Sequence, residues 1–129
     1  MFAQKKNIYI DMQNQGNVLS SNKIDLVVLV YDRIILELTK IVDAIERQDV
    51  IAKANSVSKT LQIIEIGLLS YLDLSHGEVS KNLEAFYLSA IFGITQANLK
   101  NDAERFNQIK DSFVNLREAW KEISVGQTV

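Results

Sequence analysis

Apolar residues recur at alternating spacings of three and four along the first half of the chain, a period typical of helices that pack against other helices. One stripe lies in residues 23–47 and consists of Ile24, Val28, Tyr31, Ile35, Leu38, Val42 and Ile45. A second lies in residues 50–72 and consists of Val50, Ala54, Val57, Leu61, Ile64, Leu68 and Tyr71. Each stripe predicts one helix with an apolar face.

The second half of the chain carries two more stripes. Residues 77–100 contain Val79, Leu83, Phe86, Ala90, Gly93 or Ile94, and Ala97, and residues 102–123 contain Phe106, Ile109, Phe113, Leu116, Trp120 and Ile123. Helices of similar length joined by short connections favour antiparallel sequential neighbours. We therefore predict an all-α fold: an antiparallel up-down-up-down four-helix bundle with a loosely docked N-terminal segment.

Residues suited to N-capping precede the four stripes: Asn22, Asp49, Ser75 and Asn101. The side chain of such a residue accepts a hydrogen bond from a free backbone N–H in the first helical turn. Ser75 with Glu78, and Asn101 with Glu104, also have the spacing of a capping box. These residues predict where each helix begins.

The predicted bundle domain occupies residues 22–124. Residues 1–21 form a polar N-terminal segment that contains one apolar island, made of Ile8, Tyr9, Ile10 and Met12. This segment either covers a groove of the bundle as a tethered lid or is disordered, as chain ends often are. We expect it to be mobile, and we expect residues 125–129, which continue no stripe, to form a disordered tail.

Composition narrows the class of protein. The chain has 129 residues, enough for one domain, and its lack of proline and its five glycines suit long helices. Its net charge of −2 includes no basic block, so we expect no nucleic-acid partner. It contains no cysteine, signal peptide or long apolar run, which predicts a cytoplasmic protein without membrane insertion.

Catalytic chemistry has little support in this sequence. The single histidine, His76, lies near Asp73 and Glu78 and offers half of a metal site at most, so a solvated loop histidine is the favoured interpretation. The sequence contains neither the Glu-x-x-His pairs of a di-iron bundle nor a glycine-rich phosphate loop. We predict that the protein is not an enzyme and that it holds no cofactor and no metal.

Apolar residues also occur outside the stripes, on three of the predicted helices. They include Leu26, Val27, Leu29, Val30, Ile34, Ile41, Ile63, Ile66, Leu69, Tyr87, Leu88, Ile91 and Phe92. Each bundle helix has two neighbours, so most of these residues fit a wide core face. A minority is expected to line an apolar groove for another chain. Gly67 and Gly93, inside predicted helices, fit a close approach by a neighbouring helix.

Several short motifs occur in an order and spacing that match a known pattern. They are Leu29–Asp32 with Ile34 and Ile35, Leu72-Asp73 followed by Gly77–Ser80, Asn82-Leu83 and Phe86-Tyr87, Ala97-Asn98 with Asn101-Asp102, and Leu116–Trp120. Over residues 9–123 the chain resembles the FliS family, the flagellar export chaperones that hold flagellin before secretion. It departs from that family's pattern at Asn22-Lys23, where the family has Ser-Pro, and at Arg33, where the family has glycine.

The resemblance implies a cytoplasmic secretion chaperone that binds the C-terminal segment of flagellin in apolar grooves and prevents premature polymerisation before export. We expect a monomer that binds one client molecule. The candidate client-binding residues are Tyr9, Val30, Ile34, Ile63, Ile66, Tyr87 and Ile91.

Two other functions use the same apolar surface. One is a regulatory adaptor whose partner is an anti-sigma factor or another component of the export apparatus. The other is a self-associating structural protein whose surplus apolar face forms a homodimer. Recovery of a secreted flagellin from a cell lysate distinguishes the chaperone from the adaptor, and light scattering identifies a homodimer.

Overall fold

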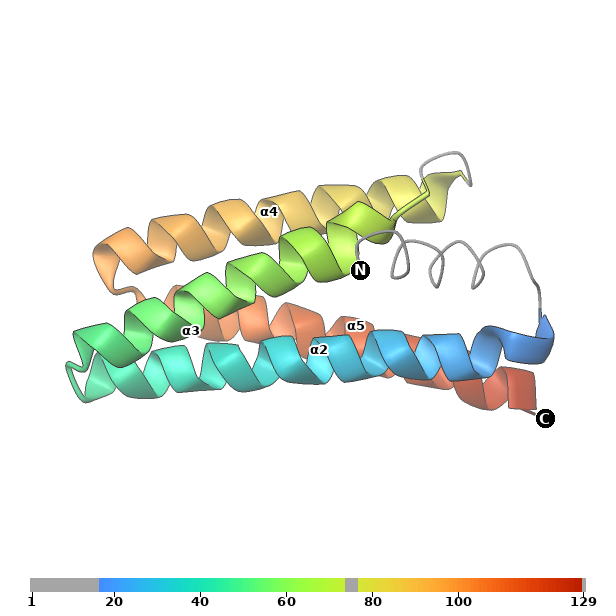
Figure 1. Ribbon diagram of the computed structural model, residues 1–129, viewed down its shortest axis with the longest axis horizontal. Helices are drawn as coiled ribbons and strands as arrows, with labels where there is room; N and C mark the ends of the chain where they lie inside the picture. The colour runs from blue at the N-terminus through green and yellow to red at the C-terminus, as the bar shows by residue number, and fades with distance from the viewer. Residues whose placement is uncertain (1–16, 74–76, 129) are drawn as a thin grey trace.

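The computed structural model describes residues 17–73 and 77–128, and the side chains of residues 24–73 and 77–123. Its helices are α2 (Asn17–Glu46), α3 (Val50–Gln62), α4 (Glu78–Lys100) and α5 (Ala103–Thr128), shown in Figure 1. After Gln62, α3 continues through a π-helical turn, Ile63–Leu68, which is wider than an α-helical turn, and then through a tighter 3-10 turn, Leu69–Tyr71. All regular structure in the described residues is helical.

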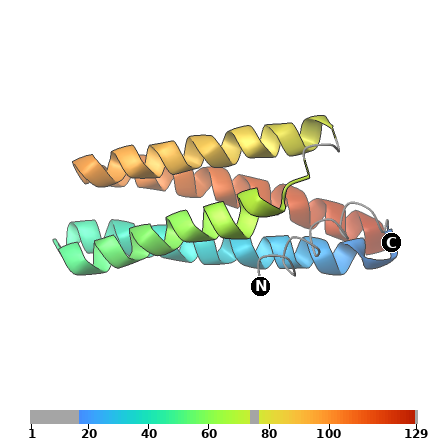
Figure 2. The same cartoon turned by 45° about the horizontal axis from the view of Figure 1, so that its top comes forward.

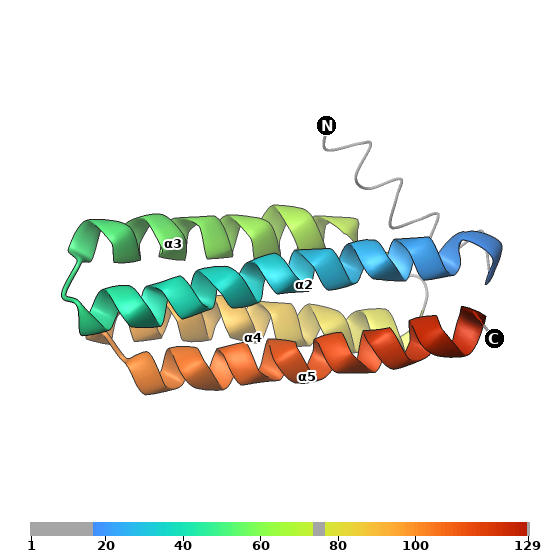
Figure 3. The ribbon, with the colours of Figure 1, turned by 90° about the horizontal axis from the view of Figure 1, so that it is seen from below.

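The helices pack side by side as an antiparallel bundle. Helix α2 lies along both α5 and α3, and α4 packs against α5 and less extensively against α3 and its π-helical continuation (Figure 2). Seen from below, α2 and α5 extend past α3 and α4 at the end away from the α2–α3 turn (Figure 3). The predicted all-α bundle is confirmed.

Residues from all four helices meet in one core. Its fully buried members include Tyr31, Ile34, Leu38, Ile41, Ile64, Leu68, Ile94, Phe106 and Phe113. Aromatic rings pack edge to face at its centre, with ring centroids 5.6 Å apart for Tyr31 and Phe113 and 5.0 Å apart for Phe86 and Phe113. Such ring pairs add to the free energy gained by burial alone.

A chain of polar atoms crosses this apolar core. The indole Nε1 of Trp120 donates a hydrogen bond to the hydroxyl of Tyr31 over 3.2 Å, and the hydroxyls of Tyr31 and Tyr87 lie 2.5 Å apart. The three residues belong to α5, α2 and α4, so the network fixes how these helices align. Burial raises the pKa of Tyr31 to about 12.

The predicted phase of α2 needs correction. The strict seven-residue repeat placed Ile35 and Val42 in the core and left Ile34 and Ile41 outside it. In the structure Ile34 and Ile41 are fully buried, whereas Ile35 and Val42 are only partly buried. An α-helix has 3.6 residues per turn and drifts by about 20° per heptad against a 3.5-residue repeat, so the buried face moves around the helix.

The ends of three predicted stripes are also wrong, because Val50, Val79 and Ile123 are 71%, 66% and 47% exposed. Val50 and Val79 lie in the first turn of a helix and Ile123 lies near the end of α5, where a helix meets fewer neighbours.

Two of the predicted caps differ from the structure. Asp49 is confirmed as the N-cap of α3, because its carboxylate accepts a hydrogen bond from the Ala52 backbone N–H over 3.1 Å. Asn22 is not a cap, since α2 begins earlier, at Asn17. Asn101 instead ends α4 in the left-handed conformation (φ 52°), which asparagine tolerates better than most residues. The adjacent Asp102 caps α5 by accepting from the Arg105 N–H.

The start of α4 differs as well. Glu78 is its first residue, and Gly77 occupies the N-cap position with φ 92° and makes no side-chain cap hydrogen bond. That positive φ favours glycine. Ser75 and His76 lie outside the described residues.

Candidate functional site

A groove of about 580 Å³ lies between α4 and α5. Leu83, Phe86 and Leu116 supply large apolar side chains to it, and Val79 and Ala119 extend this apolar lining. The remaining lining residues are polar but uncharged: Asn82, Ser112 and Asn115. A site of this composition attracts apolar side chains and offers hydrogen bonds without selecting for a charge.

The sequence builds this groove by facing small residues against large ones. On α5, Ser112, Asn115 and Ala119 follow one another at helical spacing, and their short side chains leave the hollow open. On α4, the ring of Phe86 is held by its packing against Phe113 and, at 5.8 Å between ring centroids, against Tyr87. The wall of the groove is therefore fixed by the core behind it.

A second apolar surface lies where α2 meets the π-helical turn that continues α3. A Cβ atom added at Gly67 would lie 3.5 Å from Cγ2 of Ile63 and 3.8 Å from Cγ1 of Val30. The structure thus brings together two candidate client-binding residues, Val30 and Ile63. Both are partly buried. π-helical turns often occur at functional sites, which fits a role for this turn in binding.

The distances from an added Cβ atom also test the prediction that a neighbouring helix approaches closely at Gly67 and Gly93. The space at Gly67 is ordinary van der Waals contact, so no close helix approach requires glycine there. Gly93 is different, because a Cβ at that position would lie 3.1 Å from Ile109 Cδ1 and 3.1 Å from Arg105 Nη2, both on α5. The predicted close approach is therefore confirmed at Gly93 alone.

The other candidate residues are divided between surface and core. Ile66 and Ile91 are partly buried and reach solvent. Ile34 and Tyr87 are 0% and 1% exposed, so the expectation that they lie off the core is wrong. The drift of the buried face around α2 accounts for the burial of Ile34. The contact between the hydroxyls of Tyr87 and Tyr31 accounts for the burial of Tyr87. Tyr9 lies outside the described residues.

Helix α4 also has an apolar outer face. Leu88, Phe92 and Leu99 are all exposed, and their spacings of four and seven place them on one stripe. No charged residue interrupts the sequence from Ala85 to Leu99. Thr95, a polar and exposed residue, lies on the same face between Phe92 and Leu99, so the stripe is interrupted there.

The residues that line the α4–α5 groove were not predicted as binding residues. Leu83, Phe86 and Leu116 belong to core stripes in the sequence pattern, and the structure confirms that they also pack against the core. One sequence signal for the groove was available: Ser112 and Asn115 are small polar residues, and each directly precedes a residue of the core stripe. Periodicity identifies the face of a helix but not the gap left between two helices.

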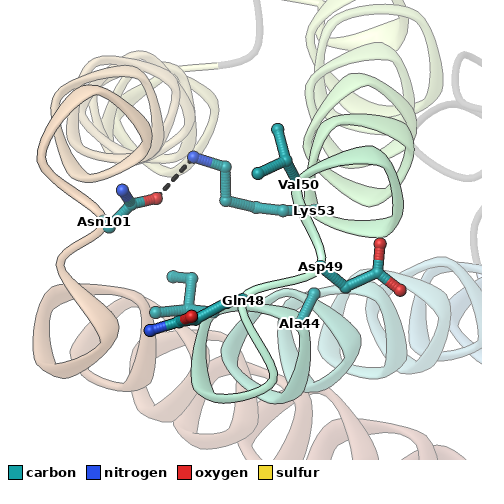
Figure 4. Close-up of a pocket in the computed structure, with 7 residues that line it drawn as sticks. Ala44, Gln48, Asp49, Val50, Lys53 and Asn101 are labelled. Carbon is teal, nitrogen blue, oxygen red and sulfur yellow. Dashed lines mark hydrogen bonds between the residues drawn. The ribbon is translucent and has the colours of Figure 1, made fainter.

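A smaller pocket of about 340 Å³ lies at the end of the bundle, where the α2–α3 turn faces the α4–α5 turn (Figure 4). Ala44, Ile45 and Val50 give it an apolar wall, and Gln48, Asp49, Lys53 and Asn101 give it polar groups. Figure 4 shows Lys53 extending from α3 towards Asn101. The pocket joins residues that are far apart in the sequence.

Within residues 17–73 and 77–128, no group of three or more His, Cys, Asp or Glu side chains could hold a metal ion. In the same part of the chain, no helix combines the length and the apolar character needed to cross a membrane.

The fold and the two hollows define a class of protein: a helical bundle with partly apolar hollows on its surface. Comparison with known proteins gives the family. The chain matches the family described as "Flagellar protein FliS" over residues 5–127. It belongs to that family, as the sequence motifs indicated.

Curated relatives support this assignment across most of the chain. The protein of Salmonella typhimurium named "Flagellar secretion chaperone FliS" is 33% identical over 117 residues, which cover 90% of this chain and 87% of the relative. The proteins of the same name from Escherichia coli and Campylobacter jejuni are each 31% identical, over 124 and 118 residues. These alignments cover 95% and 91% of this chain, and 91% and 90% of the two relatives.

Proposed function

We propose that this chain is a flagellar secretion chaperone that binds the C-terminal segment of flagellin in the cytoplasm and prevents its polymerisation before export. The observation that carries the proposal is the α4–α5 groove, an apolar hollow with an uncharged polar rim, in a chain whose relatives are named secretion chaperones. Such a groove suits the apolar face of an amphipathic helix.

Binding of this kind keeps the aggregation-prone C-terminal segment of one flagellin molecule from contacting the same segment of another flagellin molecule. A disordered client that folds into helices on the chaperone loses conformational entropy, and burial of its apolar side chains offsets that loss. The α4–α5 groove accepts one client helix. Val30, Ile63, Ile66 and Ile91 are accessible for further client contacts, and Tyr9 remains a candidate on the N-terminal segment. Ile34 and Tyr87 join the contact surface only if the helices separate.

Filling the groove tests the proposal. Ala119 is exposed and lines the groove, so Ala119→Trp should occupy it and weaken binding of a flagellin C-terminal peptide by about tenfold or more. Ala54→Trp is the matched control, because Ala54 is exposed on α3 and lines neither of the two hollows. Isothermal titration calorimetry measures affinity, and circular dichroism checks that both variants keep their helices.

The outcomes separate the site from the function. If the wild-type chain does not bind the flagellin peptide, the chaperone function is wrong. If Ala119→Trp binds as tightly as the wild type, the groove is not the client site. Recovery from a lysate of an anti-sigma factor in place of flagellin would support the regulatory adaptor. Light scattering of the free protein and of the complex should give a monomer and a complex of one chain with one client.

A further inference from the structure

The pocket at the end of the bundle contains a cation, Lys53, that no carboxylate of the described residues neutralises. Nζ of Lys53 lies 2.5 Å from Oδ1 of Asn101 and 3.2 Å from the backbone oxygen of Asn98, and it donates to both. Both acceptors are neutral oxygens. Among the described residues Lys53 forms no ion pair, and an ammonium group has three donors, so one donor is left for a ligand.

The carboxylate in the pocket lining, that of Asp49, is engaged elsewhere. Its oxygens accept from the Ala52 backbone N–H over 3.1 Å and from the Arg47 guanidinium over 3.2 Å. These interactions, the backbone hydrogen bond first, lower the pKa of Asp49 and keep it ionised. Figure 4 shows the Asp49 side chain pointing away from Lys53. The charge of Lys53 therefore remains available to an anion.

The other half of the pocket is apolar. Ala44, Ile45 and Val50 form a wall beside the cation, and Val50 is largely exposed. A ligand that matches both halves carries a carboxylate next to an apolar group. With about 340 Å³, the pocket is at the small end of ligand sites and holds a single residue more readily than a chain that passes through.

We infer that this pocket holds the C-terminal carboxylate of a bound polypeptide, with Lys53 as the cation and Ile45 and Val50 against the last side chain. The inference rests on the proposed function, which supplies a client bound by its C-terminal segment. Leu88 and Phe92 are exposed on one face of α4, and on the same face Leu99 lies two residues from Asn101 of the pocket, so separate apolar contacts are available between the middle of the bundle and the pocket. The client thus lies with its C-terminus at the turns that join α2 to α3 and α4 to α5.

The experiment compares two forms of one flagellin C-terminal peptide, with a free carboxylate and with a C-terminal amide. The full-length wild-type chain should bind the free acid about tenfold more tightly, because the amide removes a charge-assisted hydrogen bond. In Lys53→Met the two forms should bind equally and as weakly as the amide binds the wild type. Lys59→Met is the matched control, an exposed lysine on the same helix that lines neither hollow, and should preserve the difference.

Each outcome decides the inference. Equal affinity of the wild type for acid and amide overturns carboxylate capture but leaves the proposed function intact. A preference for the acid that persists in Lys53→Met shows that the carboxylate is bound elsewhere and overturns the pocket assignment. If neither peptide binds, the proposed function fails and the inference with it. Because the acid and amide forms are compared on the same wild-type protein, a loss of stability in Lys53→Met does not affect the main result.

Discussion

At the scale of single residues, the hydroxyl of Tyr31 joins three helices, which its position in an apolar stripe does not predict. Its hydroxyl meets both Trp120 and Tyr87, so Tyr31→Phe removes the centre of a buried network. We expect the free energy of unfolding to fall by about 1 to 3 kcal/mol. Urea denaturation measures this loss. Trp120→Phe should cost less stability in the Tyr31→Phe variant than in the wild type, because the Tyr31 hydroxyl that accepts from the Trp120 indole is already absent. Additive effects would show that the two groups act independently.

The raised pKa of Tyr31 gives this network a pH dependence. The folded state keeps the hydroxyl protonated up to about pH 12, whereas an unfolded tyrosine loses its proton near its ordinary pKa of 10.0. Between these values the folded state binds more protons, so the Tyr31 contribution is present below pH 10 and is lost as pH rises towards 12. Alkaline unfolding curves should therefore be shallower for Tyr31→Phe than for the wild type, and identical slopes would contradict the assignment.

Glu37 is the least expected residue in the interior. Its side chain is fully buried on α2, with Oε2 3.0 Å from Arg33 Nε and 3.6 Å from Lys40 Nζ, yet neither oxygen accepts a hydrogen bond from any residue that the structure describes. The free energy lost when a carboxylate is buried without hydrogen bonds exceeds the free energy gained from its attraction to two half-exposed cations. Glu37→Met should therefore raise the free energy of unfolding by about 1 kcal/mol. Glu46→Met, at an exposed position of the same helix, is the control. A clear loss of stability in Glu37→Met would show that the ion pairs dominate.

At the scale of elements, the sequence predicts helices well and their contacts poorly. Apolar spacing identifies all four helices, and Asp49 marks the start of α3, because both signals depend on a few adjacent residues. The burial of Ile34 and the exposure of Val50 depend on which helices lie opposite, and a repeat within one helix carries no such information. The same limit applies to the site: Val30 and Ile63 were expected, but the groove between α4 and α5 was not.

The N-terminal segment was predicted to span residues 1–21, but α2 already begins at Asn17, so the prediction for this segment concerns residues 1–16. If its apolar island, Ile8, Tyr9, Ile10 and Met12, covers a client-binding groove, the client must displace it. Deletion of residues 1–15 should then tighten binding of the flagellin peptide about threefold or more. The full chain with Ile8, Tyr9 and Ile10 changed to serine should behave like the deletion. Weaker binding in both would make Tyr9 a direct client contact, and unchanged affinity would show that the segment has no role at this site.

At the scale of the whole molecule, apolar surface and charge make separable contributions to binding. The net charge is −2, and no described residue that lines the α4–α5 groove is charged, so the main contact should depend little on salt. The proposed contact between Lys53 and a client carboxylate is the exception, since ions screen a partly exposed charge pair. We therefore expect the affinity for the amidated flagellin peptide to change less than about twofold between about 0.1 M and 0.5 M salt.

The free-acid peptide should lose more affinity over the same salt range, so that the two forms converge as the Lys53 contribution is screened. Calorimetric titrations of both peptides at each salt concentration measure this convergence. A steep salt dependence for the amide would mean that charged residues outside the groove dominate recognition, such as Arg33 and Lys40 on the outer face of α2. Parallel salt dependences for acid and amide would place the terminal carboxylate in solvent, because a screened ion pair is the interaction that distinguishes the two peptides.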